Sequence, residues 1–106
     1  MSKVANLTAQ GVIEEPNAII FGIQVHSIPS VGPSPPPPTG NLLVTVRDDA
    51  AAGGSGVILA NLFVTADGNL GTMQATFPAG VRVTKGIAVN VTANGHTDFT
   101  VIIDYA

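Results

Sequence analysis

The chain has 106 residues, of which seven are acidic and four basic, and its formal net charge at pH 7 is −3. Four cations cannot form the basic surface that phosphate contacts require, and one Tyr, four Phe and no Trp offer no stacking platform for bases. Composition therefore excludes a nucleic-acid partner. Cysteine is absent, which also excludes disulfides and thiolate metal sites.

The scarcity of charge predicts that other subunits cover part of the surface. A folded monomer of this size exposes about 5,500 Å², and ordinary composition would place about 26 charges on it. The eleven charges present leave sizeable uncharged patches, some of them apolar. The alternative is a monomer whose surface is polar through Thr, Asn, Ser and Gly.

Alternation of apolar and polar residues with a period of two runs along most of the chain and predicts β-strands. Eight short strands are expected, at residues 7–15, 18–28, 41–47, 57–65, 70–77, 81–84, 86–93 and 97–105. With no credible helix between them, residues 1–106 are predicted to form one all-β domain. We expect an antiparallel β-sandwich or jelly roll, with an open barrel as second choice.

The N-terminal part of the chain supplies the first candidates for partner contacts. They are three apolar side chains of the first predicted strand, Leu7, Val12 and Ile13. The second strand, 18–28, repeats apolar residues at every second position, which predicts one buried face; these residues are Ile19, Phe21, Ile23 and Val25.

A proline-rich insertion follows at residues 29–40, with six prolines in twelve residues. Four of them are consecutive and favour an extended polyproline II segment about 12 Å long; they are Pro35, Pro36, Pro37 and Pro38. We expect either an arm that reaches a neighbouring subunit or a rigid crossover loop. Recognition by an aromatic-lined groove is the weaker alternative.

The middle of the chain holds a strand that is apolar on both faces. In the preceding strand, Leu42, Val44 and Val46 are predicted to point inward. The Gly/Ala-rich loop at 49–56 is expected to be a mobile tip without packing contacts. In 57–65 both rows are apolar, and we expect Leu62 and Val64 to contact a partner. The alternative is that their row belongs to the core, in which case an Asp substitution there would prevent folding.

Turn residues mark the remaining strands. Asp67-Gly68 and Asn94-Gly95 tolerate positive φ and predict hairpin turns. In the last strands, every second residue is again apolar, which predicts core faces that include Ile87, Val89, Val101 and Ile103.

The C-terminal third carries a family resemblance. Residues 77–92, FPAGVRVTKGIAVNVT, combine a Pro-x-Gly turn with a Lys-Gly turn, and residues 100–105, TVIIDY, form an apolar closing strand. This ending resembles that of small β-rich virion proteins of tailed bacteriophages. The resemblance implies a capsid decoration (cement) protein or a tail or fibre component, commonly oligomeric. The proline-rich insertion is not part of the pattern.

No residue pattern points to catalysis or to a bound cofactor. The two histidines, His26 and His96, are far apart in sequence, and adjacent carboxylates in a strand point to opposite faces. A calcium site at Asp48 and Asp49 is a weak alternative that matches no established loop. We therefore expect no enzyme, no cofactor and no metal.

The sequence thus favours a structural virion protein that stabilises a shell through oligomeric apolar contacts. Its expected partners are itself, for example as a trimer, and a major capsid or other virion protein. No apolar run reaches the length of a membrane span and no signal peptide follows Met1, so assembly in the host cytoplasm is expected. The alternative is a carbohydrate-binding or adhesive β-sandwich.

Overall fold

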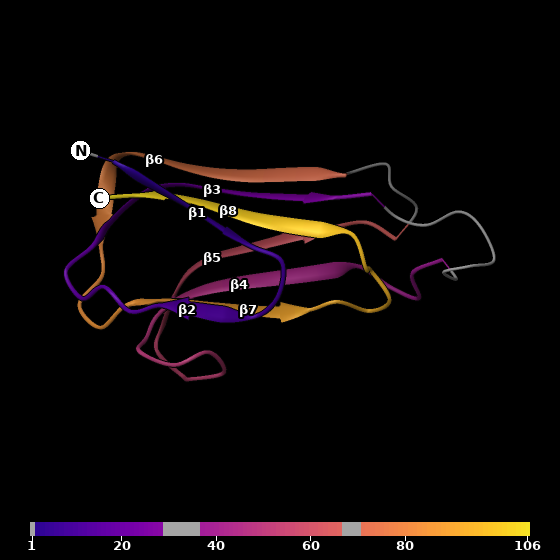
Figure 1. Ribbon diagram of the computed structural model, residues 1–106, viewed down its shortest axis with the longest axis horizontal. Helices are drawn as coiled ribbons and strands as arrows, with labels where there is room; N and C mark the ends of the chain where they lie inside the picture. Colours follow the sequence, from indigo (N-terminus) through magenta and orange to yellow (C-terminus); the bar gives the residue numbers. More distant parts are fainter. Residues whose placement is uncertain (1, 29–36, 67–70) are drawn as a thin grey trace.

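The computed structural model describes residues 2–28, 37–66 and 71–106. These residues form strands and no helix, so none of them belongs to a helix that could cross a membrane. The strands, shown in Figure 1, are β1 (Lys3–Leu7), β2 (Gly11–Ile13), β3 (Ile19–Ser27), β4 (Leu42–Asp48), β5 (Val57–Val64), β6 (Thr72–Arg82), β7 (Ile87–Thr92) and β8 (Phe99–Tyr105). The predicted all-β class is confirmed.

The strands form two four-stranded antiparallel sheets that face each other (Figure 1). Sheet A has the order β1-β8-β3-β6, and sheet B has the order β2-β7-β4-β5. Four of the neighbouring pairs within the sheets are β1 with β8, β2 with β7, β3 with β6 and β4 with β5. The chain is thus one long antiparallel ribbon, closed at β4–β5 and rolled into two sheets, which is a jelly roll.

The core lies between the sheets, and the buried residues that make it come mainly from five strands, β3, β4, β5, β7 and β8. On β4 it contains Leu42, Val44 and Val46, as the alternation predicted. On β7 and β8 the buried residues likewise include the predicted ones, Ile87, Val89, Val101 and Ile103. On β3 the register shifts between Ile20 and Gly22, so that Ile20 is buried with Ile23 and Val25 while Ile19 and Phe21 are only partly buried.

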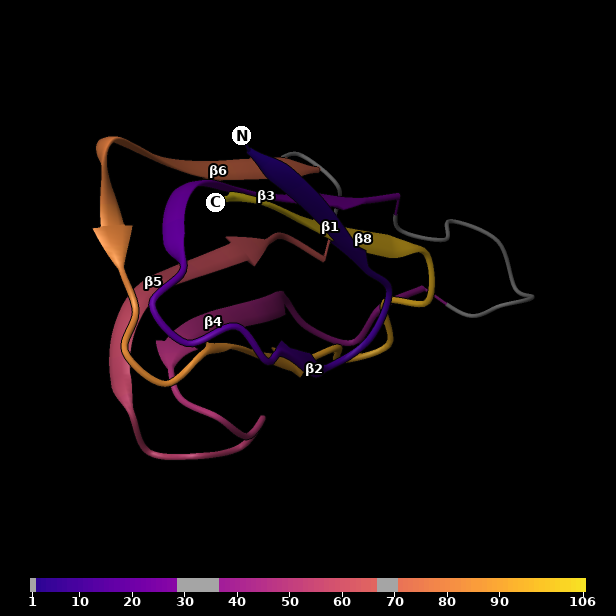
Figure 2. The same ribbon diagram turned by 60° about the vertical axis from the view of Figure 1, so that its left-hand side comes forward.

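Two of the predicted strand boundaries are wrong. The predicted first strand is divided into β1 and β2, which belong to different sheets. The predicted strands 70–77 and 81–84 are instead one strand, β6, which turns a sharp corner (Figure 2). At this corner Pro78 stands where the pairing with β3 is interrupted, and Gly80 adopts a φ of 79°. An interruption of pairing tolerates proline, because no ladder hydrogen bond is required there.

The Asn94-Gly95 turn has the predicted positive φ values but does not form the predicted hairpin. Both residues have positive φ, 48° and 92°. The turn joins β7 in sheet B to β8 in sheet A, so it is a crossover between sheets and not a hairpin. The same holds for the connection from β5 to β6, although Asp67-Gly68 itself lies outside the described residues. Local turn chemistry indicates where the chain bends, but it does not indicate which strands pair.

The loop at 49–56 is ordered by hydrogen bonds, which corrects the expectation of a tip without packing. The Asp49 carboxylate accepts the N–H groups of Ala51 and Gly56 at 3.1 and 2.9 Å. Gly53 N–H donates to Oδ1 of Asn90 on β7 at 2.8 Å. The loop therefore folds back against the outer face of sheet B. A Cβ at position 54 would lie within 3 Å of the Asp49 carboxylate, which explains glycine there.

Candidate interaction surface

The predicted contact residues of the N-terminal part do not lie together on one surface. Leu7 and Ile13 are partly buried and pack against the core. Val12 is on the other side of β2, opposite Ala88 of β7. Of the proline run, Pro37 is exposed and Pro38 half-buried, while Pro35 and Pro36 lie outside the described residues. The segment that contains them joins β3 in sheet A to β4 in sheet B, so it crosses between the sheets.

The structure places Leu62 and Val64 in the core, which corrects their prediction as contact residues. Their exposed fractions are 7% and 0%. They lie opposite Val44 and Leu42 of β4, whose side chains are also buried. A partner cannot contact this row without opening the sandwich.

The apolar surface that remains open belongs to the other row of β5. Phe63 lies opposite Leu43 of β4, and these two side chains are 39% and 44% exposed. Nearer the start of β5, Ile58 is also exposed on this row, whereas its exposed neighbour Val57 points to the opposite face. We call this strip the β5 surface; it consists of Leu43, Thr45, Ile58, Asn61 and Phe63. The alternation did not predict that this row is the exposed one, because β5 is apolar on both faces and its pattern does not show which face is inward.

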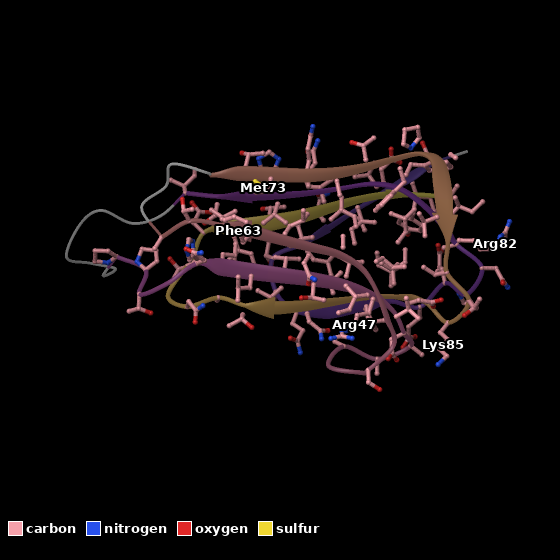
Figure 3. The ribbon with its side chains drawn as sticks, turned by 180° about the vertical axis from the view of Figure 1, so that it is seen from behind. Arg47, Phe63, Met73, Arg82 and Lys85 are labelled. Carbon is pink, nitrogen blue, oxygen red and sulfur yellow. The ribbon has the colours of Figure 1, made fainter. Side chains whose placement is uncertain are left out.

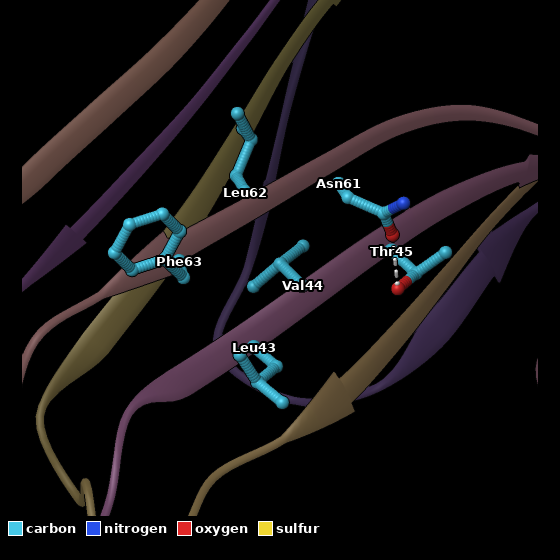
Figure 4. Close-up of a pocket in the computed structure, with 6 residues that line it drawn as sticks. All are labelled: Leu43, Val44, Thr45, Asn61, Leu62 and Phe63. Atoms are coloured by element: carbon cyan, nitrogen blue, oxygen red, sulfur yellow. Dashed lines mark hydrogen bonds between the residues drawn. The ribbon is translucent and has the colours of Figure 1, made fainter.

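A depression of about 190 Å³ lies at the end of the β5 surface that holds Leu43 and Phe63 (Figure 4). It is lined by these two side chains with Thr45 and Asn61, and by the neighbouring Val44 and Leu62. The Thr45 hydroxyl donates to Oδ1 of Asn61 at 2.8 Å. This bond joins the two polar side chains of the strip, which leaves the depression mainly apolar.

The charged residue nearest to the β5 surface is Arg47, which lies opposite Ile58 near the start of β5. Figure 3 shows Phe63 well separated from Arg47 and Lys85. The Arg47 guanidinium donates to the Gly56 carbonyl at 2.9 Å, which holds the loop of 49–56 against the end of β4. β5 itself has no ionisable residue from Val57 to Val64. The edge strand itself therefore lacks the charge with which exposed sheet edges are usually protected.

The carboxylates considered as calcium ligands are already engaged by protein donors. Asp48 accepts the N–H of Thr84, the N–H of Lys85 and the Thr84 hydroxyl, at distances from 2.9 to 3.1 Å. Partial burial opposes its ionisation, but the hydrogen bonds from Lys85 and Thr84 outweigh that effect and hold the pKa of Asp48 below its ordinary value. Its role is to fasten the turn between β6 and β7 to the end of β4.

We expect Asp48→Asn to lower the free energy of unfolding by about 1–2 kcal/mol at neutral pH, because an amide replaces one acceptor oxygen by a donor facing N–H groups. The stabilisation by Asp48 is fully present above pH 3.8, its unperturbed pKa. It is lost as the pH falls below that value through the lowered folded-state pKa. Urea unfolding at pH 7 and pH 3 measures both effects.

Asp98→Asn is the matched control for this prediction. Asp98 is exposed and its side chain makes no hydrogen bond within the described part of the chain. Its substitution should change the unfolding free energy by less than about 0.5 kcal/mol. Equal losses for the two variants would contradict the role assigned to Asp48.

The outer face of sheet A is polar and carries a second depression, of about 260 Å³. Its lining includes Phe21, Gln24, Thr76 and Asp104. One carboxylate oxygen of Asp104 is buried and has no hydrogen-bond partner among the described residues. In the part of the chain that the structure describes, no group of three or more acidic or histidine side chains could hold a metal ion.

The two histidines do not form a joint site. His26 is on the outer face of sheet A, where its ring nitrogens lie 3.1 Å from the Thr72 hydroxyl and 3.2 Å from the Gln24 amide oxygen. His96 is buried and lies 2.8 Å from the Ser27 hydroxyl. Each is satisfied by polar neighbours, which favours structural roles.

Comparison with known proteins gives a likeness of fold. No protein-family model matches this chain, and no curated protein matches it. Among solved structures, the chain is similar to one in the acidic stable capsid structure of Helicobacter pylori bacteriophage KHP30. The TM-score is 0.54 and the identity 12%, over 99% of this chain and 85% of that chain. The likeness of fold therefore extends over nearly the whole of this chain and most of that chain.

Proposed function

We propose that this protein is a structural component of a bacteriophage virion, and specifically a decoration or cement protein that stabilises a shell through apolar contacts. The observation that carries the proposal is the β5 surface, an uncharged strip on an edge strand of a protein that is itself poor in charge. A protein that works alone in water normally protects such an edge. A protein that works in an assembly covers it with neighbours.

Three features support this function, of which the first two both rest on the fold. The jelly roll is an architecture of viral capsid domains, although it also occurs in lectins. The similar chain of the phage capsid has the same fold and is only slightly longer, since 99% of this chain covers 85% of it. The resemblance of the C-terminal strands to small virion proteins rests on the sequence alone. We propose further that the segment 29–40, with Pro37 and Pro38 at its end, acts together with Val12 in contacts with the shell.

Carbohydrate binding remains the second candidate because of the outer face of sheet A. Its depression combines a carboxylate on Asp104, an amide on Gln24 and a hydroxyl on Thr76 with the ring of Phe21. Such groups could hydrogen-bond a hydroxyl-rich ligand. However, Phe21 is partly buried, and an exposed flat aromatic platform is what sugar recognition normally uses.

The test is to express the gene together with its genomic neighbours and to separate particles from free protein on a density gradient. We expect the chain to sediment with shells and to raise the temperature at which they release their contents. A chain found only among free protein would contradict the virion role. Retention on immobilised glycans by that free protein, reduced by Asp104→Asn, would favour the second candidate instead.

A further inference from the structure

The two sheets end in four edge strands, and three of these have features that discourage pairing with another strand. β1 carries Lys3, which forms an ion pair with Glu15 at 2.9 Å. β2 has only three residues. β6 contains Pro78 and a sharp corner, and it ends at Arg82 (Figure 2). Charge, shortness, proline and irregular backbone are the usual protections of a sheet edge.

The fourth edge strand, β5, lacks charge and proline along its eight residues. Its one irregularity is a register shift against β4, between the pairs Val46–Ala60 and Arg47–Ile58, which leaves Leu59 as an extra residue. From Ala60 to Val64 the strand is regular. Within the described residues, no backbone hydrogen bond joins this segment to a strand on the side away from β4. A row of backbone donors and acceptors is therefore available there.

We infer that β5 pairs with β5 of a second copy of this chain, antiparallel and about a two-fold axis at Leu62. The regular segment has five residues, and Leu62 is its middle residue. In this register Ala60 lies opposite Val64 of the other copy, and Asn61 lies opposite Phe63. Sheet B then continues through both copies as one eight-stranded sheet, with its apolar core rows still facing inward.

Charge and symmetry favour a second copy of this chain as the partner that pairs with β5. In a two-fold contact the same surface of both copies comes together. An edge strand that carries a charge would therefore bring like charges close to each other. β1 and β6 would do so through Lys3 and Arg82, whereas β5 brings none. Strand addition needs backbone groups and apolar side chains, and β5 offers both. A trimer, considered from the sequence, would instead need a contact between two different surfaces.

The area of the contact predicts a reversible dimer. The paired segment brings one exposed apolar side chain of each copy, Phe63, into the contact, whereas Leu43 is on β4 and Ile58 lies before the segment. Together with the paired backbone, such a contact stays below about 1,200 Å², in the range of weak and transient interfaces. We therefore expect a monomer–dimer equilibrium at roughly micromolar to millimolar concentration. The inference rests on the proposed function because a shell component works as many copies at high local concentration.

The first test compares two amide side chains on two different edge strands, β5 of sheet B and β6 of sheet A. Asn61 on β5 accepts a hydrogen bond from Thr45, and Gln74 on β6 accepts one from Gln24 at 3.3 Å. Both side chains are exposed. In sedimentation equilibrium of the purified chain, Asn61→Lys should weaken the dimer at least tenfold and Gln74→Lys less than twofold. A wild-type chain that stays monomeric at millimolar concentration, or the reverse order of the two variants, would overturn the inference.

The second test measures the register, because the chain has no cysteine of its own. Asn61→Cys and Phe63→Cys chains are mixed under mild oxidation, and the mixed disulfide should exceed either homodimer. Gln74→Cys should form none above the background of random collision. Random yields for all combinations would refute β5 pairing. These measurements use the chain alone, so a negative result would not bear on whether the chain sediments with shells. The β5 dimer and the virion role can therefore be refuted separately.

Discussion

Val64→Asp should remove most or all of the stability of the folded state. The Val64 side chain is fully buried between the sheets, opposite Leu42, in a core whose described buried residues are nearly all aliphatic. Burial of an unpaired charge, or of a protonated acid without partners, costs on the order of 4–5 kcal/mol or more. A domain of this size has about 5–15 kcal/mol of stability in total. Circular dichroism and urea unfolding would measure the loss.

The matched control is Phe63→Asp, one residue away on the outer row of β5. There the carboxylate is in water, and the cost is limited to the half-buried part of the ring, about 2 kcal/mol or less. This variant should keep its cooperative unfolding transition while it loses the dimer. If Phe63→Asp unfolded the chain and Val64→Asp did not, the assignment of the two rows to surface and core would be wrong.

The sequence predicted most of the strands because their physics is local. Period-two alternation is a property of each strand alone, and for β4, β7 and β8 it identified the buried rows correctly. It was less successful on β3, because the irregularity between Ile20 and Gly22 shifts the alternation by one residue. The division of the first predicted strand and the continuity of β6 through Pro78 depend on which sheet each segment joins. That information is in the tertiary structure.

The alternation of apolar and polar residues could not identify the candidate surface, for a related reason. β5 is apolar on both rows, a pattern that a fully buried strand also shows. Only the pairing with β4, in which Leu42 and Val44 point inward, determines that Val64 and Leu62 are core and that Phe63 is outside. The low charge indicated correctly that an apolar strip would be exposed. It could not indicate on which strand.

His96→Ala should lower the free energy of unfolding by about 2–4 kcal/mol. Its Nε2–H donates to the Gly40 carbonyl at 3.0 Å, and its Nδ1 therefore accepts from the Ser27 hydroxyl at 2.8 Å. The ring thus connects the end of β3, the segment before β4 and the turn between β7 and β8, where the chain crosses between the sheets. Alanine would leave a cavity and two polar groups without their partner.

His26→Ala is the control for His96, because the chain has no other histidine. His26 also has two polar neighbours, but it lies on the outer face of sheet A, where water can replace the ring. We expect a loss of less than about 1 kcal/mol for His26→Ala. Since 1 kcal/mol shifts the melting temperature of a domain of this size by about 4–8 °C, thermal scans separate the variants easily. A larger shift for His26→Ala than for His96→Ala would mean that the sheet crossings are held together without His96.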